Sequence, residues 1–246
     1  MTVRAAPEEQ VKLLELQTID SRTQQIQHTR RTLPQLAELA RITTAADALR
    51  RRMAIEQGTI EDLGTELRRV ESDVSVVQAR VARDSARLAS TASAKDAQGL
   101  EHELASLARR QSDLEDMQLA VMQKLEDQEQ VISGLEGERD ELAERRDGLE
   151  AERDAALARL DAEAAELTTR RETLAASVPP DLLALYEKIR ARYGIGAALL
   201  RRGVSGGSNV ALTASDLAAV RAAPPDEVVL DPESGCILVR TEESGL

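Results

Sequence analysis

Residues 60–88, IEDLGTELRRVESDVSVVQARVARDSARL, decide the fold. Apolar side chains recur there every seven positions, at Ile60, Leu67, Val74, Val81 and Leu88. A second apolar set lies three positions after the first, at Leu63, Val70 and Val77. Two apolar positions in each heptad form the seam of a left-handed coiled coil. The stretch therefore predicts a long helix that buries one narrow stripe against another helix.

A second heptad run lies downstream and is broken only by Gln128: Leu100, Leu107, Leu114, Val121, Leu135, Leu142 and Leu149. Between the two runs, residues 89–94 are small and polar, and Ser93 with Asp96 fits a capping box that starts a new helix. The helical patterns cover about residues 8–89 and 94–176, with an interruption expected at Pro34 because proline breaks helix hydrogen bonds.

Two arms of near-equal length predict a monomeric antiparallel hairpin with its turn near residues 89–94. Each arm would be about 120 Å long at the helical rise per residue. The alternative is one continuous helix that forms a parallel dimer. The equal arms and the capped break favour the hairpin.

Composition points to a rod rather than a globule. Only 1% of the 246 residues are aromatic, whereas 31% are charged, and the formal net charge is −12. About −10 of this charge lies before residue 178, and such an acidic rod repels phosphate backbones and anionic membranes. A single cysteine, Cys236, excludes an internal disulfide, and no run is apolar enough to span a bilayer. These features predict a cytoplasmic protein that binds neither membranes nor nucleic acid.

The remaining residues, 178–246, predict a small α+β domain after a hairpin that occupies residues 1–177. A short amphipathic helix is expected at 181–193, a capped helix from Thr213 to Ala222, and strands at 228–230 and 237–239. Such a small domain cannot bury a sufficient core alone. We therefore expect it to pack on the 181–193 helix or on the rod, within a fold that is mainly α.

Several motifs resemble a family of bacterial coiled-coil proteins that end in a C4-type zinc ribbon. They are VKLLELQ at 11–17 with Asp20, Leu33-Pro34, Lys95-Asp96 with LEHEL at 100–104, VPPDLLALY at 178–186 and CILVRT at 236–241. The resemblance covers nearly the whole chain. It implies a coiled-coil hairpin with a terminal ribbon, and an adaptor or chaperone role such as those in flagellar and type III secretion assembly. It also implies a proposed nucleic-acid role for the ribbon.

The same resemblance implies four metal-binding cysteines at positions that here hold Ser205, Ser208, Asp231 and Ser234. Serine hydroxyls are poor zinc ligands, and a structural site needs four good ones. Only Asp231 and Cys236 could serve nearby, and no histidine follows His102. We therefore expect no metal or other cofactor, and two turns held by hydrogen bonds of the hydroxyls to the backbone instead.

Five basic residues lie close together in the sequence: Lys188, Arg190, Arg192, Arg201 and Arg202. They could bind nucleic acid or an acidic partner, or they could form a solvated face that pairs with nearby acidic groups. The chain has only two tyrosines to stack on bases, Tyr186 and Tyr193, so the structural interpretation is favoured.

Catalytic signals are missing from the sequence. His28 and His102 have no neighbouring nucleophile, and there is no glycine-rich phosphate loop or nucleophile–histidine–acid set. The sequence predicts a non-enzymatic adaptor that binds an unidentified protein, with the rod as a spacer and the terminal domain as a docking surface. The alternatives are nucleic-acid binding through 188–202 and a purely structural spacer.

Overall fold

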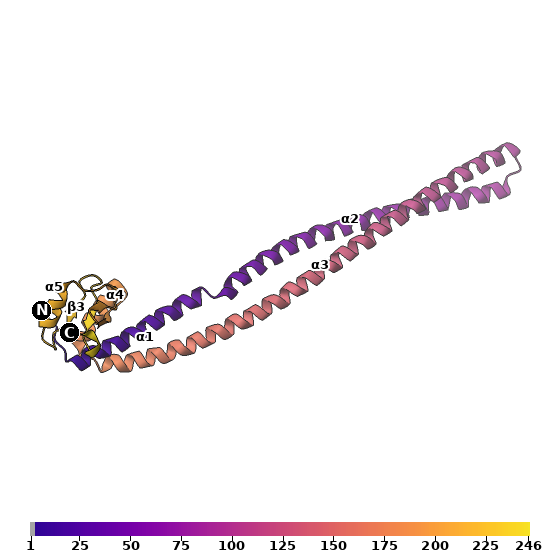
Figure 1. The fold of residues 1–246 in the computed structure, drawn as a ribbon. Helices are drawn as coiled ribbons and strands as arrows, with labels where there is room; N and C mark the ends of the chain where they lie inside the picture. Colours follow the sequence, from indigo (N-terminus) through magenta and orange to yellow (C-terminus); the bar gives the residue numbers. More distant parts are fainter. Residues whose placement is uncertain (1–2) are drawn as a thin grey trace. The chain divides into compact units, whose positions relative to one another are not determined.

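The computed structural model describes residues 3–246 and shows a long helical hairpin followed by a small strand-containing region (Figure 1). The helices are α1 Pro7–Arg31, α2 Pro34–Ser90, α3 Ala94–Ala176, α4 Pro180–Tyr193 and α5 Ala214–Ala222. The strands are β1 Ala197–Arg201, β2 Val204–Ser205, β3 Val229–Leu230 and β4 Ile237–Val239, followed by the 3-10 helix η1 Glu242–Ser244.

The chain divides into two compact units. The basal unit contains the N-terminal residues through Leu36 together with Ala151–Leu246, and the distal unit is Ala37–Glu150. The distal unit thus holds most of α2, the hairpin turn and the first two-thirds of α3. The basal unit holds α1, the end of α3, α4 and the sheet.

The helix breaks lie where the sequence predicts them. Helix α2 ends at Ser90 and α3 begins at Ala94, with the Ser93 hydroxyl accepting a bond from the Asp96 amide at 3.3 Å. This bond satisfies one of the free amides of the first helical turn. Helix α1 ends at Arg31, and Pro34 opens α2 at its first position, where a proline needs no amide partner.

The seam of the distal unit follows the heptads. Its buried apolar residues are Ile42, Leu49 and Val70 on α2 and Leu107, Leu114, Val121 and Leu135 on α3. Gln128, which interrupts the α3 heptads, lies opposite Glu56, which occupies the matching phase of α2. Its amide nitrogen donates to the Glu56 carboxylate at 2.5 Å. A polar pair within an apolar seam favours one register of the two arms over others.

A second acidic side chain interrupts the seam near the turn. Asp84 is only 6% exposed, and the guanidinium groups of Arg80 and Arg87 lie 3.8 and 3.7 Å from its carboxylate. Arg80 also reaches Glu103 on the opposite arm. Ion pairs with exposed partners contribute little to stability, typically less than about 1 kcal/mol each. The apolar seam, rather than these pairs, holds the arms together.

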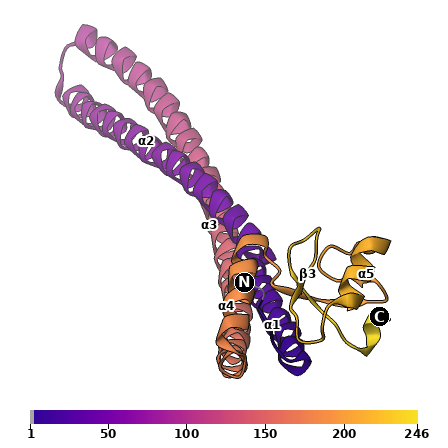
Figure 2. The same cartoon turned by 90° about the vertical axis from the view of Figure 1, so that its left-hand side faces the viewer.

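The basal unit contains a four-stranded sheet of order β2-β1-β4-β3. Strand β1 pairs in parallel with β4, whereas β2 and β3 pair antiparallel with their neighbours. Helix α1 packs against β1 and β4, and α4 lies beside α1 (Figure 2). One buried cluster joins these elements and includes Leu13, Leu16, Leu182, Tyr186, Ile189, Ala197, Ile237 and Val239. The terminal region therefore takes its core from the hairpin base and from α4, as the sequence predicts.

Backbone bonds also join the start of the chain to the loop before β3. The Ala5 amide donates to the Asp226 carbonyl at 2.8 Å, and the Val228 amide donates to the Val3 carbonyl at 3.2 Å. The buried Gln10 amide group donates to the carbonyls of Ala5 and Pro225. Residues more than 200 positions apart thus form one folded unit.

Arg240 fixes the loop that follows α5. Its guanidinium donates to five backbone carbonyl oxygens, those of Val220, Ala223, Pro224, Pro225 and Glu227. Two of them belong to the C-terminal end of α5, where carbonyls lack helical partners and a positive charge is favoured. The proline-rich loop therefore has a defined path without any regular secondary structure.

The hairpin, its turn and the expected helices and strands are confirmed. The parallel pairing of β1 with β4 was not predicted, because β1 and β4 are separated by 35 residues and local pattern carries no information about pairing. Within residues 3–246, no helix is both long enough and apolar enough to cross a membrane.

The Glu56–Gln128 pair can be tested by replacing both residues with leucine. We expect the Glu56→Leu/Gln128→Leu variant to unfold at a higher denaturant concentration, with a gain of about 1–2 kcal/mol, because apolar seam residues bury more favourably than a polar pair. Urea unfolding followed by circular dichroism measures this. The matched control, Gln57→Leu/Gln130→Leu on the exposed faces, should change little. A lower midpoint for the seam variant would show that the pair is a net stabiliser.

Candidate functional site

The four positions that the family resemblance assigns to metal ligands lie together in the structure. Ser205 ends β2 and Asp231 follows β3, and both are buried. The hydroxyls of Ser205 and Ser234 donate to the same Asp231 carboxylate oxygen at 2.7 and 2.5 Å. The two turns, 205–208 and 231–234, are therefore joined through one carboxylate.

Backbone amides complete this serine–aspartate cluster. The amides of Gly207 and Ser208 donate to the Ser205 hydroxyl at 3.1 and 3.4 Å, and the Glu233 amide donates to Asp231 at 3.2 Å. Hydroxyl-to-backbone bonds were predicted here, but the two shortest bonds run from hydroxyl to carboxylate. Charge-assisted bonds of this kind are stronger than neutral ones.

The protonation chemistry of the cluster follows from its burial. Burial pushes the pKa of Asp231 upward, but donation from Ser234 and Ser205 outweighs it, and the pKa lies below its ordinary value. Burial raises the pKa of the Cys236 thiol, whose sulfur lies 3.2 Å from the Ser234 hydroxyl oxygen. The thiol is therefore protonated at neutral pH, and a protonated thiol is a poor nucleophile and metal ligand.

Packing around Cys236 is tight. A Cβ atom added at Gly207 would lie 2.4 Å from the Cys236 sulfur and 2.8 Å from the Ser234 hydroxyl. Only glycine fits at this position, so the turn passes directly against the cluster. Across residues 3–246, no three histidine, cysteine, aspartate or glutamate side chains are grouped as metal ligands would be.

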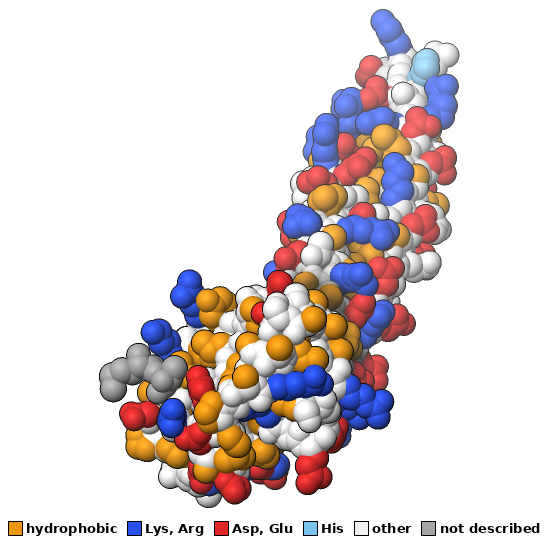
Figure 3. Space-filling view, turned by 60° about the vertical axis from the view of Figure 1, so that its left-hand side comes forward, with side chains coloured by type: hydrophobic (Ala, Val, Ile, Leu, Met, Phe, Trp, Pro, Cys, Tyr) orange, Lys and Arg blue, Asp and Glu red, His pale blue; other side chains and the backbone are white. Residues whose placement is uncertain are grey.

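The five basic residues singled out in the sequence do not form one surface. Lys188 and Arg192 are exposed one turn apart on α4, and the Arg192 guanidinium stacks over the Tyr193 ring at 5.1 Å. Arg201 and Arg202 lie at the far end of β1, where Arg201 pairs with Glu243 at 3.2 Å. Arg190 points inward, toward Asp20. In Figure 3, blue side chains on the terminal region are scattered among apolar ones.

Asp20 is the centre of a polar network at the hairpin base. It is 3% exposed and accepts bonds from Arg171 on α3 at 2.6 Å and from the Tyr186 hydroxyl on α4 at 2.7 Å. The Arg190 guanidinium lies 3.3 Å from the same carboxylate. Glu187 pairs with both arginines, so two carboxylates face two guanidinium groups. The network ties α1, α3 and α4 into one body.

Gln17, one turn before Asp20, extends the network to the sheet. Its side-chain oxygen accepts a bond from the Gly196 amide at 2.7 Å, just before β1 begins. A Cβ atom at Gly196 would lie 2.4 Å from the Tyr186 ring, so this position also requires glycine. The entry of the chain into the sheet is thus fixed by α1 on one side and by Tyr186 on the other.

Three side chains of the network, Arg171, Tyr186 and Glu187, have shifted pKa values. The bond to Asp20 raises the pKa of Arg171, and burial, followed by the bond to Asp20, raises the pKa of Tyr186. Burial would raise the pKa of Glu187, but donation from Arg171 and Arg190 outweighs it and the pKa lies below its ordinary value. These three shifts favour a charged Arg171, a neutral Tyr186 and a charged Glu187, which suits a structural role rather than proton transfer.

Sequence reasoning did not find this network. One signal was present, because Asp20 lies on the same helical face as Leu13 and Leu16, which are buried. A charged residue in an apolar stripe needs a partner. The partners Arg171 and Arg190 lie about 150 and 170 positions away, and the sequence pattern could not identify them.

The CT398-like coiled-coil hairpin domain matches residues 16–194, which include both arms, α4 and the whole Asp20 network. The chain belongs to this family. The match ends before β1, so it identifies the coiled-coil hairpin and does not identify the terminal strands as a zinc ribbon.

The family relationship extends to full-length relatives. The chain is 36% identical to an uncharacterized protein of Mycobacterium tuberculosis over 98% of each sequence. A solved structure from Mycobacterium smegmatis has a TM-score of 0.87 and 32% identity, covering 97% of this chain and 100% of that one. The CT398 structure from Chlamydia trachomatis has a TM-score of 0.67 at 18% identity, covering 95% of this chain and 98% of that one, and supports the fold alone.

The network is tested by Asp20→Asn. We expect this change to lower the free energy of unfolding by about 2–3 kcal/mol, because two partly buried guanidinium groups lose their shared carboxylate. Glu15→Gln is the matched control, since Glu15 pairs with Arg170 at the exposed surface of the same helices. That control should cost less than about 1 kcal/mol. Equal effects of the two variants in denaturant unfolding would contradict a central role for Asp20.

Proposed function

We propose that the protein is a non-enzymatic, cytoplasmic adaptor that binds other proteins. The observation that carries this proposal is the set of large apolar side chains left exposed on the distal unit. Ile55, Val76 and Leu119 are 69%, 65% and 64% exposed, on a surface that is otherwise mostly charged. A hairpin of two helices buries only the facing sides of its arms, so the outer faces remain available to partners.

The basal unit supports the same function in a different way. The Asp20 network holds α1, α3 and α4 together through ion pairs and hydrogen bonds, and Gln17 extends it to the start of β1. The serine–aspartate cluster lies where the resemblance implies a zinc site, and we propose that the terminal region is a zinc-ribbon-like module stabilised by hydrogen bonds. Such a module would present exposed side chains, including Tyr193 and Val210, to a partner protein, while the Asp20 network holds the helices beneath it.

The adaptor proposal is tested by affinity purification of the full-length chain from its native host after mild crosslinking. We expect one or more proteins to be recovered in a defined ratio to the chain. The wild-type chain is compared with variants that replace exposed apolar residues of the distal unit. Recovery that is the same for all variants would argue that the exposed residues do not bind partners.

Nucleic-acid binding is the second candidate, because Arg201 and Arg202 are exposed at one turn. We expect no measurable binding to duplex DNA or structured RNA at physiological salt, since the chain is acidic and Arg201 is already paired. Fluorescence anisotropy with labelled nucleic acids measures this. A micromolar, salt-sensitive affinity that disappears in Arg201→Glu/Arg202→Glu would replace the adaptor proposal with nucleic-acid binding.

A further inference from the structure

One segment of α3 differs from the rest of the hairpin. Residues 117–123, MQLAVMQ, carry no charge and include four large apolar side chains. Val121 is in the seam, but Leu119 is 64% exposed, and Met117 and Met122 are 50% and 48% exposed. A surface helix normally carries polar residues on its outer face. Here apolar side chains surround the helix, which is typical of a helix that is covered on both sides.

Two of these exposed residues, Leu119 and Met122, lie in the same surface groove. Leu119 and Met122 line a shallow surface groove on the distal unit with Leu67 of α2 and with Leu125, Gln123, Glu126 and Glu129 of α3. Methionine side chains are flexible and polarizable, so they adapt to partner surfaces of varied shape. Two of the four methionines of the chain lie in this short segment.

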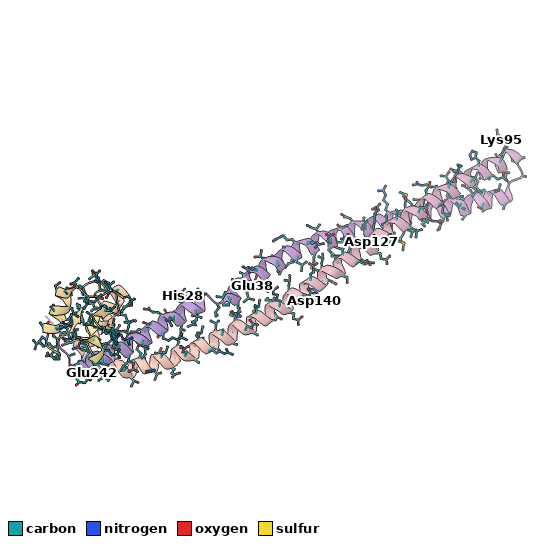
Figure 4. All side chains as sticks on the ribbon, in the orientation of Figure 1. His28, Glu38, Lys95, Asp127, Asp140 and Glu242 are labelled. Atoms are coloured by element: carbon teal, nitrogen blue, oxygen red, sulfur yellow. The ribbon has the colours of Figure 1, made fainter. Side chains whose placement is uncertain are left out.

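The surroundings of the groove are strongly acidic. Residues 56–71 of α2 and 113–129 of α3 together contain eleven acidic and three basic side chains, a net charge of −8 out of −12 for the whole chain. Figure 4 labels one of them, Asp127, on α3 between the turn and Asp140. In other parts of the hairpin, acidic side chains pair with arginine, as in Arg80–Glu103 and Arg145–Glu38.

The acidic side chains around the groove have no such partners. Ten of the eleven are exposed, and none of these ten forms an ion pair within residues 3–246: Glu61, Asp62, Glu66, Glu71, Asp113, Glu115, Asp116, Glu126, Asp127 and Glu129. The eleventh, Glu56, accepts the seam bond from Gln128. Unpaired charges of one sign create a field that attracts an oppositely charged partner.

We propose that the groove around Leu119 and Met122 binds a basic amphipathic helix of a partner protein. The apolar face of that helix would cover Leu119, Met122 and Leu67, and its lysine and arginine residues would lie over the acidic side chains on either side. Helix-in-groove binding of this kind uses apolar anchors spaced by one helical turn. The proposal rests on the adaptor function and identifies the partner's chemistry and its docking site.

A second copy of the chain fits the groove less well. Self-association through this face would bring together two surfaces that each carry a net charge of −8. Repulsion between unpaired charges of the same sign opposes such a dimer. A basic helix removes this repulsion and covers the same apolar residues.

The test uses the full-length protein and a labelled synthetic helix of about 18 residues, or five turns, with leucines on one face and lysines on the other. We expect saturable binding in fluorescence anisotropy that weakens as salt increases. Leu119→Ser/Met122→Ser should weaken binding at least about tenfold, because burial of two large apolar side chains is lost. Leu36→Ser is the matched control, since Leu36 is also an exposed leucine on a helix but lies in the basal unit, outside the groove, and the affinity of this variant should equal that of the wild type.

Further controls separate the possible outcomes. Replacing the lysines of the peptide with glutamates should abolish binding. The Leu119→Ala variant should also weaken peptide binding, and circular dichroism checks that its helices remain folded. Unchanged peptide affinity in Leu119→Ser/Met122→Ser, or an equal loss of affinity in Leu36→Ser, would overturn the proposed binding site. Sedimentation showing a dimer that depends on Leu119 would assign the groove to a second copy.

Different experimental results would contradict the proposed docking site and the proposed adaptor function. If Leu119→Ser/Met122→Ser neither weakens peptide binding nor changes the proteins recovered from the host, the groove is not the docking site. The adaptor function stands in that case, because a protein is still recovered in a defined ratio. If no protein is recovered but the peptide binds in the groove as described, the adaptor function is overturned and the groove remains a binding site for basic helices.

Discussion

The structure depends most on one buried carboxylate, that of Asp20. A buried charge is strongly unfavourable unless it is paired and hydrogen-bonded, and Asp20 meets both conditions through Arg171, Arg190 and Tyr186. These partners come from two other helices, so the charge is satisfied only when α1, α3 and α4 are assembled. The terminal sheet then packs on this base and takes Leu13 and Leu16 of α1 into its core.

The small sheet has a second constraint, the serine–aspartate cluster. Its strands contain two to five residues each, which is too few to bury a core of their own. Asp231 joins the two turns through hydroxyls of Ser205 and Ser234, and Gly207 lets the first turn approach Cys236 closely. The hydrogen bonds of this cluster connect the two turns, which a metal ion does in other small domains.

Regular patterns in the sequence predicted the hairpin, its turn and the break at Pro34, because these follow from spacing and capping within a few residues. The family resemblance placed Ser205, Ser208, Asp231 and Ser234 at two turns, which the structure brings together. The sequence could not show that Gln128 faces Glu56, or that Asp20 meets Arg171, because such pairs depend on how distant segments align. The acidic residues around Leu119 were visible in the sequence, but only the structure shows that the exposed ones form no ion pairs within residues 3–246.

The features of both units support the proposal that the protein binds other proteins. The distal unit exposes apolar side chains among unpaired acidic groups, and the basal unit holds a small sheet on three helices. We propose that hydrogen bonds, rather than a bound metal ion, hold the two turns of that sheet together.

Elemental analysis of the purified full-length chain, with thermal unfolding measured in the presence and absence of a strong chelator, tests this claim most directly. Hydrogen bonding through Asp231 predicts no stoichiometric zinc and the same melting temperature in both conditions. About one zinc ion per chain, removed by the chelator with a fall in melting temperature, would contradict it.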